Sequence, residues 1–394
     1  MASLPSALPG WPYFAEDEIQ SVAKVLHSGK VNYWTGNECS LFEQEFAHFI
    51  DVPYAIALAN GTIALELALY ALGIGSGDDV IVPCRTFMAS ASCVVARGAR
   101  PIVADIDPIS QNITAATAQQ VLTPNTKAII VVHLAGWPCE MDDLLQFAAA
   151  NNLKVIEDCA QAHGAQYHGK YVGSFGDIAA FSFCQDKIMT TGGEGGILVT
   201  KDQEIWRKAW AYKDHGKNPD IALIPAEHTK YRRMYEGFGT NWRITEMQAA
   251  IGRVQLTKLP SWLDIRKRNA ELFRVGLQNI TALDLPAPPA YLKHAYYKYY
   301  AFVKPQYLSA GWDRDRIIRE INVRRVPCGY GSCGEIYLEK AFEYAGLQPK
   351  ERFPNARKLG ETSLMFLVHP TLTEENIMWM CSIITRVFRD AQAD

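Results

Sequence analysis

The sequence lacks the features that mark membrane, secreted and nucleic-acid-binding proteins. Its 394 residues hold 39 Lys and Arg against 42 Asp and Glu, a net charge of −3, whereas binding to a nucleic acid or an anionic membrane needs a basic surface. No apolar run approaches the roughly 18 residues of a membrane span, and residues 1–20 lack the basic and apolar regions of a secretory signal. We therefore expect a cytoplasmic protein whose partners include neither nucleic acid nor membrane.

The nine cysteines give no sign of a disulfide framework or a metal centre. They are odd in number, widely scattered and never spaced as CxxC, whereas both kinds of site show regular spacing. At roughly 150 residues per domain the length allows two or three domains, and a chain this long can bury enough core to fold without disulfides or metal. We expect no bound metal and a reducing compartment.

Short apolar runs alternate with helical patterns in the first half of the chain. The runs, which are typical of strands, lie at 54–60, 79–83, 100–106, 127–134, 154–158, 178–184 and 195–200. Helical spacing of apolar residues separates several of them, at 61–74, 88–98 and 141–152. Continuous apolar strands joined by helices predict a mostly parallel sheet covered on both faces. The last two runs extend this sheet and leave room for one reversed strand.

A different pattern follows in the second half. The elements expected there are a long helix from 243 to about 275, a proline-rich linker (DLPAPPAY) at 284–291, an aromatic strand at 294–304 and helices at 313–323 and 373–390. We therefore predict a large α/β domain over residues 1–260 and a smaller C-terminal α+β domain over residues 261–394.

The residues that carry chemistry lie around the fifth and sixth predicted strands. Asp158 ends a buried strand, at the sheet edge where open α/β folds bind ligands. Lys187 follows the next strand and precedes a glycine-rich turn at 192–196. A lysine that can form a Schiff base, together with an acid that can pair with a pyridinium nitrogen, suggests pyridoxal 5'-phosphate. Gly61 and Thr62, at the start of a helix, offer backbone N–H groups to its phosphate.

Several longer motifs surround these residues. One runs from EDCAQAHGA through GSFGDIAAFSF to Lys187 and TGGEGG, and the others are GKVNYWTGNECSLFEQEFA, NGTIALELALYALGIGSGDDVIVP, VVHLAGWPCEMD and FGTNWRITEMQAAIGRVQL. Their content and order resemble the DegT/DnrJ/EryC1/StrS family of pyridoxal-phosphate-dependent sugar aminotransferases over nearly the whole chain. The resemblance implies a type I aminotransferase fold, with pyridoxal 5'-phosphate as cofactor and pyridoxamine 5'-phosphate as intermediate.

The resemblance also implies a role for each residue at a matching position. Lys187 would form the Schiff base and then shuttle protons, Asp158 would pair with the pyridine nitrogen, and Gln161 would hydrogen-bond the phenolic oxygen. The other implied cofactor contacts are ring stacking by Phe87, phosphate binding by Gly61, Thr62 and Ser182, and a contact from Asn241 to the phosphate in the neighbouring subunit. The last contact implies a homodimer with a shared active site.

Structural alternatives stay open for single residues. Asp158 could cap the following helix, Phe87 could be core, and Gly61 with Thr62 could form a plain strand-to-helix turn. The string GYGSCG at 329–334 matches a dinucleotide-binding fingerprint, but no clear buried strand precedes it and too little α/β pattern follows it. A nicotinamide-dependent dehydrogenase is therefore a poor alternative.

The substrate hypothesis rests on departures from the family pattern. Cys328 and Gly329 stand where His and Tyr are expected, and Arg85 stands where an uncharged residue is common. Arg85, Arg324 and Arg325 could clamp a carboxylate, or they could form surface ion pairs. If these arginines bind a carboxylate, the substrate is an acidic sugar. The best hypothesis is amino transfer from glutamate to the C8 aldehyde of an oxidised 3-deoxy-manno-octulosonate (Kdo), a step towards a deoxyamino sugar in lipopolysaccharide biosynthesis.

Three alternatives accompany this hypothesis. The acceptor could be a nucleotide-linked 3-keto or 4-keto hexose. The chain could instead be a non-catalytic, pyridoxal-phosphate-binding regulatory protein. A pyridoxal-dependent dehydratase is disfavoured, because relatives with that activity carry His where this chain has Lys187. The sequence leaves open whether glutamate or glutamine donates the amino group.

Overall fold

A seven-stranded sheet forms the centre of the molecule. The computed structural model describes residues 8–223 and 234–392. The strands in spatial order are β1 (Tyr54–Leu58), β9 (Gly196–Thr200), β8 (Ile178–Ser182), β5 (Lys154–Asp158), β4 (Thr126–Val132), β2 (Asp79–Pro83) and β3 (Arg100–Ala104). Every pair is parallel except those that β9 makes with β1 and β8. The predicted mostly parallel sheet with one reversed strand is confirmed.

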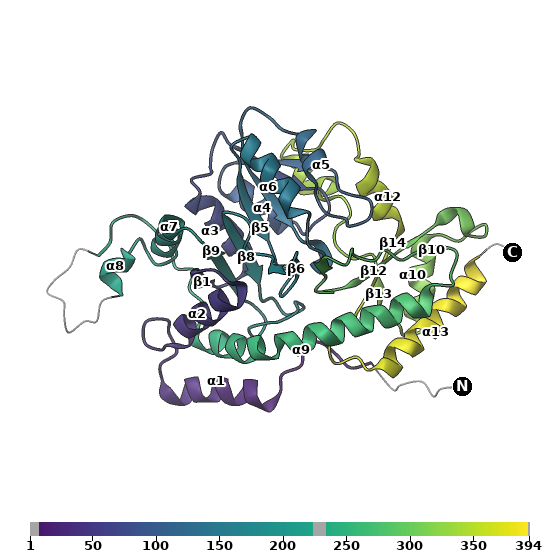
Figure 1. The fold of residues 1–394 in the computed structure, drawn as a ribbon, viewed down its shortest axis with the longest axis horizontal. Coiled ribbons are helices and arrows are strands. Elements are labelled where there is room, and N and C mark those ends of the chain that lie inside the picture. Colours follow the sequence, from purple (N-terminus) through teal and green to yellow (C-terminus); the bar gives the residue numbers. More distant parts are fainter. Residues whose placement is uncertain (1–7, 224–233, 393–394) are drawn as a thin grey trace.

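Helices cover both faces of this sheet (Figure 1). The helices packed on one face are α3 (Gly61–Ala71), α4 (Ala89–Ala96) and α7 (Gln203–Lys213), and those on the other are α2 (Glu38–Ile50), α5 (Ala115–Gln119), α6 (Met141–Ala150) and the first half of α9 (Glu246–Leu277). The strands read as continuous apolar runs because both of their faces are buried in this way. Their carboxyl ends meet at one edge, where Asp158 and Ser182 lie.

The smaller part is an antiparallel sheet with helices against it. Its strands in order are β10 (Leu283–Asp284), β12 (Tyr299–Val303), β14 (Ser363–Phe366) and β13 (Cys328–Gly329), and its main helices are α10 (Arg314–Val323) and α13 (Glu374–Ala391). A third sheet consists of β11 (Leu292–Lys293), β6 (Gln166–Tyr167) and β7 (Lys170–Tyr171). The remaining helices are α1 (Glu16–Ser28), η1 (Leu134–Gly136), α8 (Pro219–Ala222), η3 (Pro305–Tyr307), η4 (Ile336–Leu338), α11 (Lys340–Tyr344) and α12 (Pro354–Thr362).

The predicted boundary between residues 260 and 261 falls inside a continuous helix. Helix α9 begins at a capping box, where Thr245 Oγ1 accepts from the Gln248 N–H, and it crosses from the large part to the small part (Figure 1). Leu259 packs in the core of the large part, whereas Phe273 packs in that of the small part. The apolar face of one helix thus serves two cores, so no break in the sequence marks the boundary.

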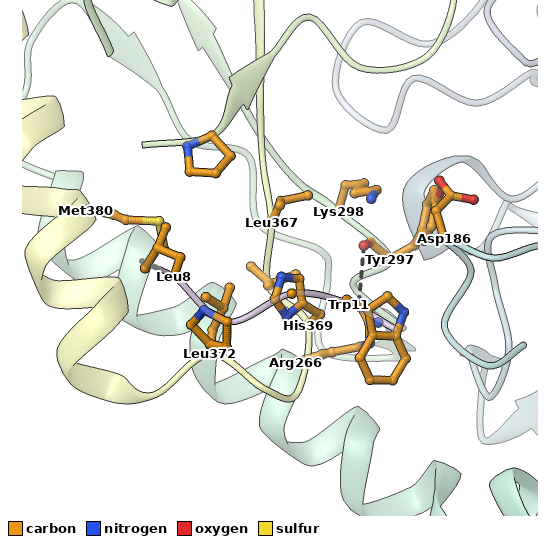
Figure 2. A pocket seen from close by; sticks show the side chains of 14 residues that line it. Leu8, Trp11, Asp186, Arg266, Tyr297, Lys298, Leu367, His369, Leu372 and Met380 are labelled. Carbon is orange, nitrogen blue, oxygen red and sulfur yellow. Dashed lines mark hydrogen bonds between the residues drawn. The ribbon is translucent and has the colours of Figure 1, made fainter. Parts of the chain in front are cut away.

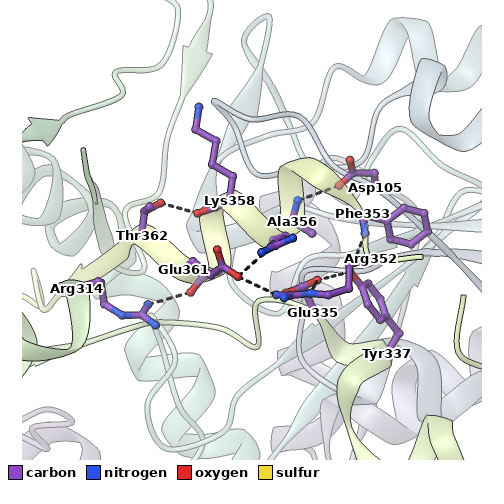
Figure 3. Close-up of polar contacts among 12 residues, drawn as sticks. Asp105, Arg314, Glu335, Tyr337, Arg352, Phe353, Ala356, Lys358, Glu361 and Thr362 are labelled. Atoms are coloured by element: carbon purple, nitrogen blue, oxygen red, sulfur yellow. Dashed lines mark hydrogen bonds and ion pairs between the residues drawn. The ribbon is translucent and has the colours of Figure 1, made fainter. Parts of the chain in front are cut away.

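A segment after residue 330 also departs from the predicted division. Tyr337 and helix α12 pack into the core of the large part, not into that of the small one. The Ala356 N–H donates to Asp105 Oδ1 at 3.0 Å, and Arg352 pairs with Glu335 beside it (Figure 3). This segment therefore ties the C-terminal third of the chain to the edge of the large sheet.

The predicted linker at 284–291 connects β10 in the small sheet to β11 beside the large part. None of the helices in the described residues is long and apolar enough to cross a bilayer.

Candidate active site

A cavity of about 790 Å³ opens at the carboxyl edge of the large sheet. Seven residues predicted from the sequence line it together, namely Gly61, Thr62, Phe87, Asp158, Gln161, Ser182 and Lys187. Two of them end strands β5 and β8, and the others lie at the start of α3 or in the loops that follow strands. Residues more than a hundred positions apart in the sequence are thus brought around one space.

Asp158 offers a buried carboxylate that lacks a cation. Its Oδ2 accepts from Ser90 Oγ at 2.9 Å, and its Oδ1 accepts from the Ala160 N–H at 3.1 Å. Burial raises the pKa of Asp158, against the smaller opposing effects of these hydrogen bonds. No ion pair involves this carboxylate among the described residues. A protonated ring nitrogen in the cavity would supply the missing positive charge.

Lys187 lies in the loop between β8 and β9, with its side chain only 16% exposed. Its Nζ is 3.6 Å from Asp186 Oδ1 and 5.0 Å from the centroid of the Tyr297 ring. Its backbone carbonyl accepts from Trp11 Nε1 at 2.8 Å. The loop is therefore anchored on the side away from the sheet, and the amine is held between an acid and an aromatic ring.

Asp186 and Tyr297 form a pair that no motif of the sequence indicated. The Tyr297 hydroxyl donates to the Asp186 carboxylate. Burial works to raise the pKa of Asp186, but the charge of Lys187 and the Tyr297 hydrogen bond outweigh it and lower the pKa. The only sequence signal for Asp186 was its position next to Lys187, and Tyr297 stood in a run that read simply as an aromatic strand.

The start of α3 forms a cradle for a phosphate. Asn60 caps the helix by accepting from the Ile63 N–H at 2.9 Å. A Cβ atom added to Gly61 would lie 2.5 Å from Ser182 Cβ, so only glycine permits this close approach. The N–H groups of the first turn and the positive end of the helix dipole face the cavity beside the Ser182 hydroxyl.

Phe87 and Gln161 complete the cavity. Phe87 is 66% exposed although it is a large aromatic side chain, and it stands at the cavity wall. Gln161 is buried, and its Oε1 accepts from the Ala135 N–H at 2.8 Å, which leaves its NH₂ group to donate into the cavity. An aromatic face for a ring and a donor for a phenolic oxygen are therefore both present. These residues, with Asp158, Lys187 and the helix start, fit pyridoxal 5'-phosphate.

The predicted arginine clamp does not form. Arg85 is fully buried and donates through Nε to Gln111 Oε1 at 2.9 Å, and it does not line the cavity. Arg324, at the end of α10, pairs with Glu320, and Arg325 is exposed in the turn that follows. The structure does not bring these three arginines together at the cavity, because the side of a turn to which an arginine points depends on packing that the sequence does not display.

Asn241 is exposed and does not line the cavity of its own chain. Its backbone pairs with Asp214, and its Oδ1 accepts from the Arg243 N–H at 3.4 Å. Its contact with a neighbouring subunit's cofactor stays a prediction.

A buried cluster next to Asp158 contains residue types that can bind a metal ion, but the carboxylate oxygens of its Glu157 already accept hydrogen bonds. His133, Glu157 and Cys159 place donor atoms within 4.8 Å of one another. Both Glu157 oxygens are already used, since they accept from three backbone N–H groups at 2.7–2.8 Å and from His133 Nε2 at 3.1 Å. His133 Nδ1 in turn accepts from the Cys139 N–H at 3.0 Å. The cluster is a hydrogen-bonded anchor for the strand end that carries Asp158.

Comparisons with known proteins agree with this geometry. The model of the DegT/DnrJ/EryC1/StrS aminotransferase family matches residues 12–385. The chain is 33% identical to the GDP-perosamine synthase of Escherichia coli O157:H7, over 90% of this chain and 91% of that one. It is 35% identical to the UDP-N-acetyl-3-dehydro-alpha-D-glucosamine 3-aminotransferase of Acidithiobacillus ferrooxidans, over 94% of each chain. The crystal structure of an aminotransferase from Psychrobacter cryohalolentis superposes with a TM-score of 0.95 at 52% identity, covering 97% of this chain and 99% of that chain.

Proposed function

The chain belongs to the DegT/DnrJ/EryC1/StrS aminotransferase family, and from that premise we propose that it transfers an amino group from glutamate to a 3-keto or 4-keto hexose carried on a nucleotide. Membership of this family makes the chain a pyridoxal-phosphate-dependent sugar aminotransferase. It also removes the non-catalytic regulatory alternative. The single observation that carries the chemistry is the meeting of Lys187 and Asp158 in one cavity.

The protein's own residues divide the work of such a transfer. Pyridoxal phosphate, when bound, supplies an electron sink and a carrier for the amino group. Asp158 would hold the ring nitrogen protonated, and the start of α3 with Ser182 would hold the phosphate. Phe87 would orient the ring by contact with its face. Lys187 would carry the proton between the substrate carbon and the cofactor carbon, as a general acid and base held beside Asp186.

The nucleotide sugar replaces the octulosonate as the favoured acceptor. The names of two relatives that match along more than 90% of their length contain GDP- and UDP-linked sugars. The argument for an acidic sugar rested on Arg85, Arg324 and Arg325, which do not form a carboxylate site. A cavity of about 790 Å³ lies towards the upper end of the usual range for ligand sites and leaves room for a sugar beside the cofactor.

A panel assay tests the acceptor. Purified protein with pyridoxal phosphate and glutamate is offered UDP-, dTDP- and GDP-linked 3-keto and 4-keto hexoses, and separately the C8 aldehyde of the octulosonate. We expect aminated product with at least one nucleotide sugar, none with the octulosonate, and none from the Lys187→Ala variant. Turnover with the octulosonate alone would refute the proposal.

We also propose a homodimer with shared active sites. Two observations support it: Asn241 is solvent-exposed outside its own cavity, and Phe238 nearby is fully exposed although it is apolar. Mixing two inactive variants tests the idea. A dimer of one Lys187→Ala and one Asn241→Ala chain would contain one intact site, so activity should return on mixing. If the chain is monomeric by sedimentation and mixing restores nothing, the shared site is wrong.

A further inference from the structure

A second cavity, of about 370 Å³, lies beside the catalytic one. The two share Asp186, Tyr297 and Lys298 as lining residues. Figure 2 shows Lys298, Tyr297 and Asp186 at one end of this second cavity, with Arg266, His369 and Trp11 beyond them. These three residues therefore form a wall that the two cavities share.

Two cations line this second cavity without a matching anion. Arg266 on α9 is 1% exposed, and its Nη1 donates to the carbonyls of Tyr296 and Tyr297 at 3.2 Å. Its Nε has no hydrogen-bond partner in the part of the chain that the structure describes. Lys298 Nζ makes neither a hydrogen bond nor an ion pair with any described residue. Burial lowers the pKa of Arg266 to about 9 and that of Lys298 to about 8.

The other titratable groups at the cavity offset these cations only in part, through the charge of Asp186. Among residues 8–223 and 234–392, Asp186 is the only carboxylate that lines it, and this carboxylate already accepts from the Tyr297 hydroxyl and lies 3.6 Å from Lys187 Nζ. His369 is neutral, because burial first, and then the nearby cations, lower its pKa to about 3. The cavity therefore holds a buried Arg266 and a half-buried Lys298 that share one already hydrogen-bonded carboxylate, so its net charge is positive and an anionic group is the ligand that fits it.

Lys298 also lies close to the reacting centre. Its Nζ is 4.6 Å from the centroid of the Tyr297 ring, and Lys187 Nζ is 5.0 Å from the same centroid. Because both amines approach the same ring, they lie less than about 10 Å apart. The side chain of an amino acid bound at Lys187 is therefore near enough to extend towards Lys298.

We infer that Lys298 and Arg266 bind the distal carboxylate of the amino donor and thereby select glutamate over glutamine. This inference rests on the proposed aminotransferase function and names the donor of the same site. The amide of glutamine has no charge to offer the two cations, so it would leave them unpaired in a buried site. A carboxylate accepts hydrogen bonds from both side chains and cancels their excess charge.

The first test measures the binding of a donor analogue that cannot react. Glutarate, which has two carboxylates and no amine, is titrated calorimetrically into the cofactor-loaded protein. Loss of one charge-assisted contact should weaken glutarate binding about tenfold to a hundredfold in Lys298→Gln, while Lys298→Arg retains most of the affinity. The matched control is Lys293→Gln, an exposed lysine on β11 outside both cavities, and it should bind glutarate as the wild type does. Failure of the wild type to bind glutarate overturns the inference.

Donor specificity provides the second test. Release of the 2-oxo acid is measured in a single donor half-reaction with glutamate, glutamine and alanine, without any sugar. In Lys298→Gln we expect kcat/KM for glutamate to fall about tenfold to a hundredfold and the other two donors to change by less than about threefold. Equal losses for all three donors would assign Lys298 to the α-carboxylate or to folding and would overturn the inference. If no donor reacts even with the wild type, the proposed function fails, while the glutarate titration still decides the cavity.

Discussion

Replacing Asp158 by asparagine separates the charge of this carboxylate from its shape. The amide oxygen can accept the hydrogen bond of the Ala160 N–H, now 3.1 Å from Oδ1, and the amide nitrogen can donate to Ser90 Oγ, now 2.9 Å from Oδ2. Ser90 Oγ can then donate to Thr86 Oγ1, which lies 2.9 Å away and can act as either donor or acceptor. Every hydrogen bond therefore survives, and only the negative charge is removed.

The variant should have opposite effects without and with the cofactor. In the cofactor-free protein Asp158 is a buried acid that forms no ion pair within the described part of the chain, so its replacement should leave the free energy of unfolding unchanged or raise it. In the loaded protein the ring nitrogen loses its counter-charge. Removing one member of a buried ion pair costs about 3–5 kcal/mol, which corresponds to a fall in kcat/KM of about 200-fold to 5,000-fold.

The pH dependence of stability provides a third test of the role of Asp158. Burial holds the pKa of Asp158 above its usual value in the folded, cofactor-free chain. The folded state then binds this proton more tightly than the unfolded state, so the contribution of Asp158 to stability falls as the pH rises from about 4 through the folded pKa. The asparagine variant lacks this contribution. Its advantage over the wild type should therefore grow with pH across that interval.

Urea unfolding of the cofactor-free proteins at several pH values, together with turnover of the loaded proteins, measures all three effects. The reasoning about Asp158 is refuted if Asp158→Asn keeps full activity. It is equally refuted if the cofactor-free variant loses more than about 1 kcal/mol of stability at neutral pH, because a substitution that keeps every hydrogen bond cannot account for such a loss.

Three further predictions follow from buried contacts. Gly61→Ala places a methyl group 2.5 Å from Ser182 Cβ, so pyridoxal phosphate affinity, measured by spectroscopic titration, should fall about tenfold or more; unchanged affinity would remove the cradle. Arg85→Met should leave the KM of the sugar acceptor unchanged, because Arg85 does not line the catalytic cavity, and should change the free energy of unfolding by no more than about 1 kcal/mol, because removing two buried Nη groups without partners among the described residues offsets the loss of the bond to Gln111; a raised acceptor KM would restore the clamp. Glu157→Gln should lose about 2–3 kcal/mol in urea unfolding, because an NH₂ group would face backbone donors. Burial raises the pKa of Glu157, but the hydrogen bond and charge of His133 help to lower it overall. The stability that this carboxylate contributes should therefore be present above about pH 4.3 and disappear as the pH falls through the lower folded pKa. An equal loss of unfolding free energy on acidification in wild type and Glu157→Gln would contradict this.

The catalytic cavity was predictable because its residues stand at ends of elements. Asp158 and Ser182 close apolar strands, and Gly61 opens a helix, so the alternation of strand and helix places all three at one edge of a parallel sheet. Lys187 follows one of these strands by only a few residues. Local patterns were sufficient because short connections leave the chain little choice of where such residues go.

The division of the chain and the charge of its second cavity were not predictable in this way. Helix α9 has one unbroken helical pattern, yet Leu259 and Phe273 belong to different cores. The sequence did not distinguish the basic residues that line a cavity from those on the surface, and departures from the family pattern pointed to Arg85, Arg324 and Arg325. Only the fold shows which basic side chains are buried beside the reacting centre.

The sequence by itself determined the order of strands and helices and the chemical groups at their ends, because hydrophobic period and connection length act over a few neighbouring residues. The tertiary structure decided which cation lacks a partner. Arg266, Lys298 and Asp186 come from three separate segments, and the cost of burying a charge depends on every group that packs around it. That dependence is long-range, so it becomes visible only when the chain is folded.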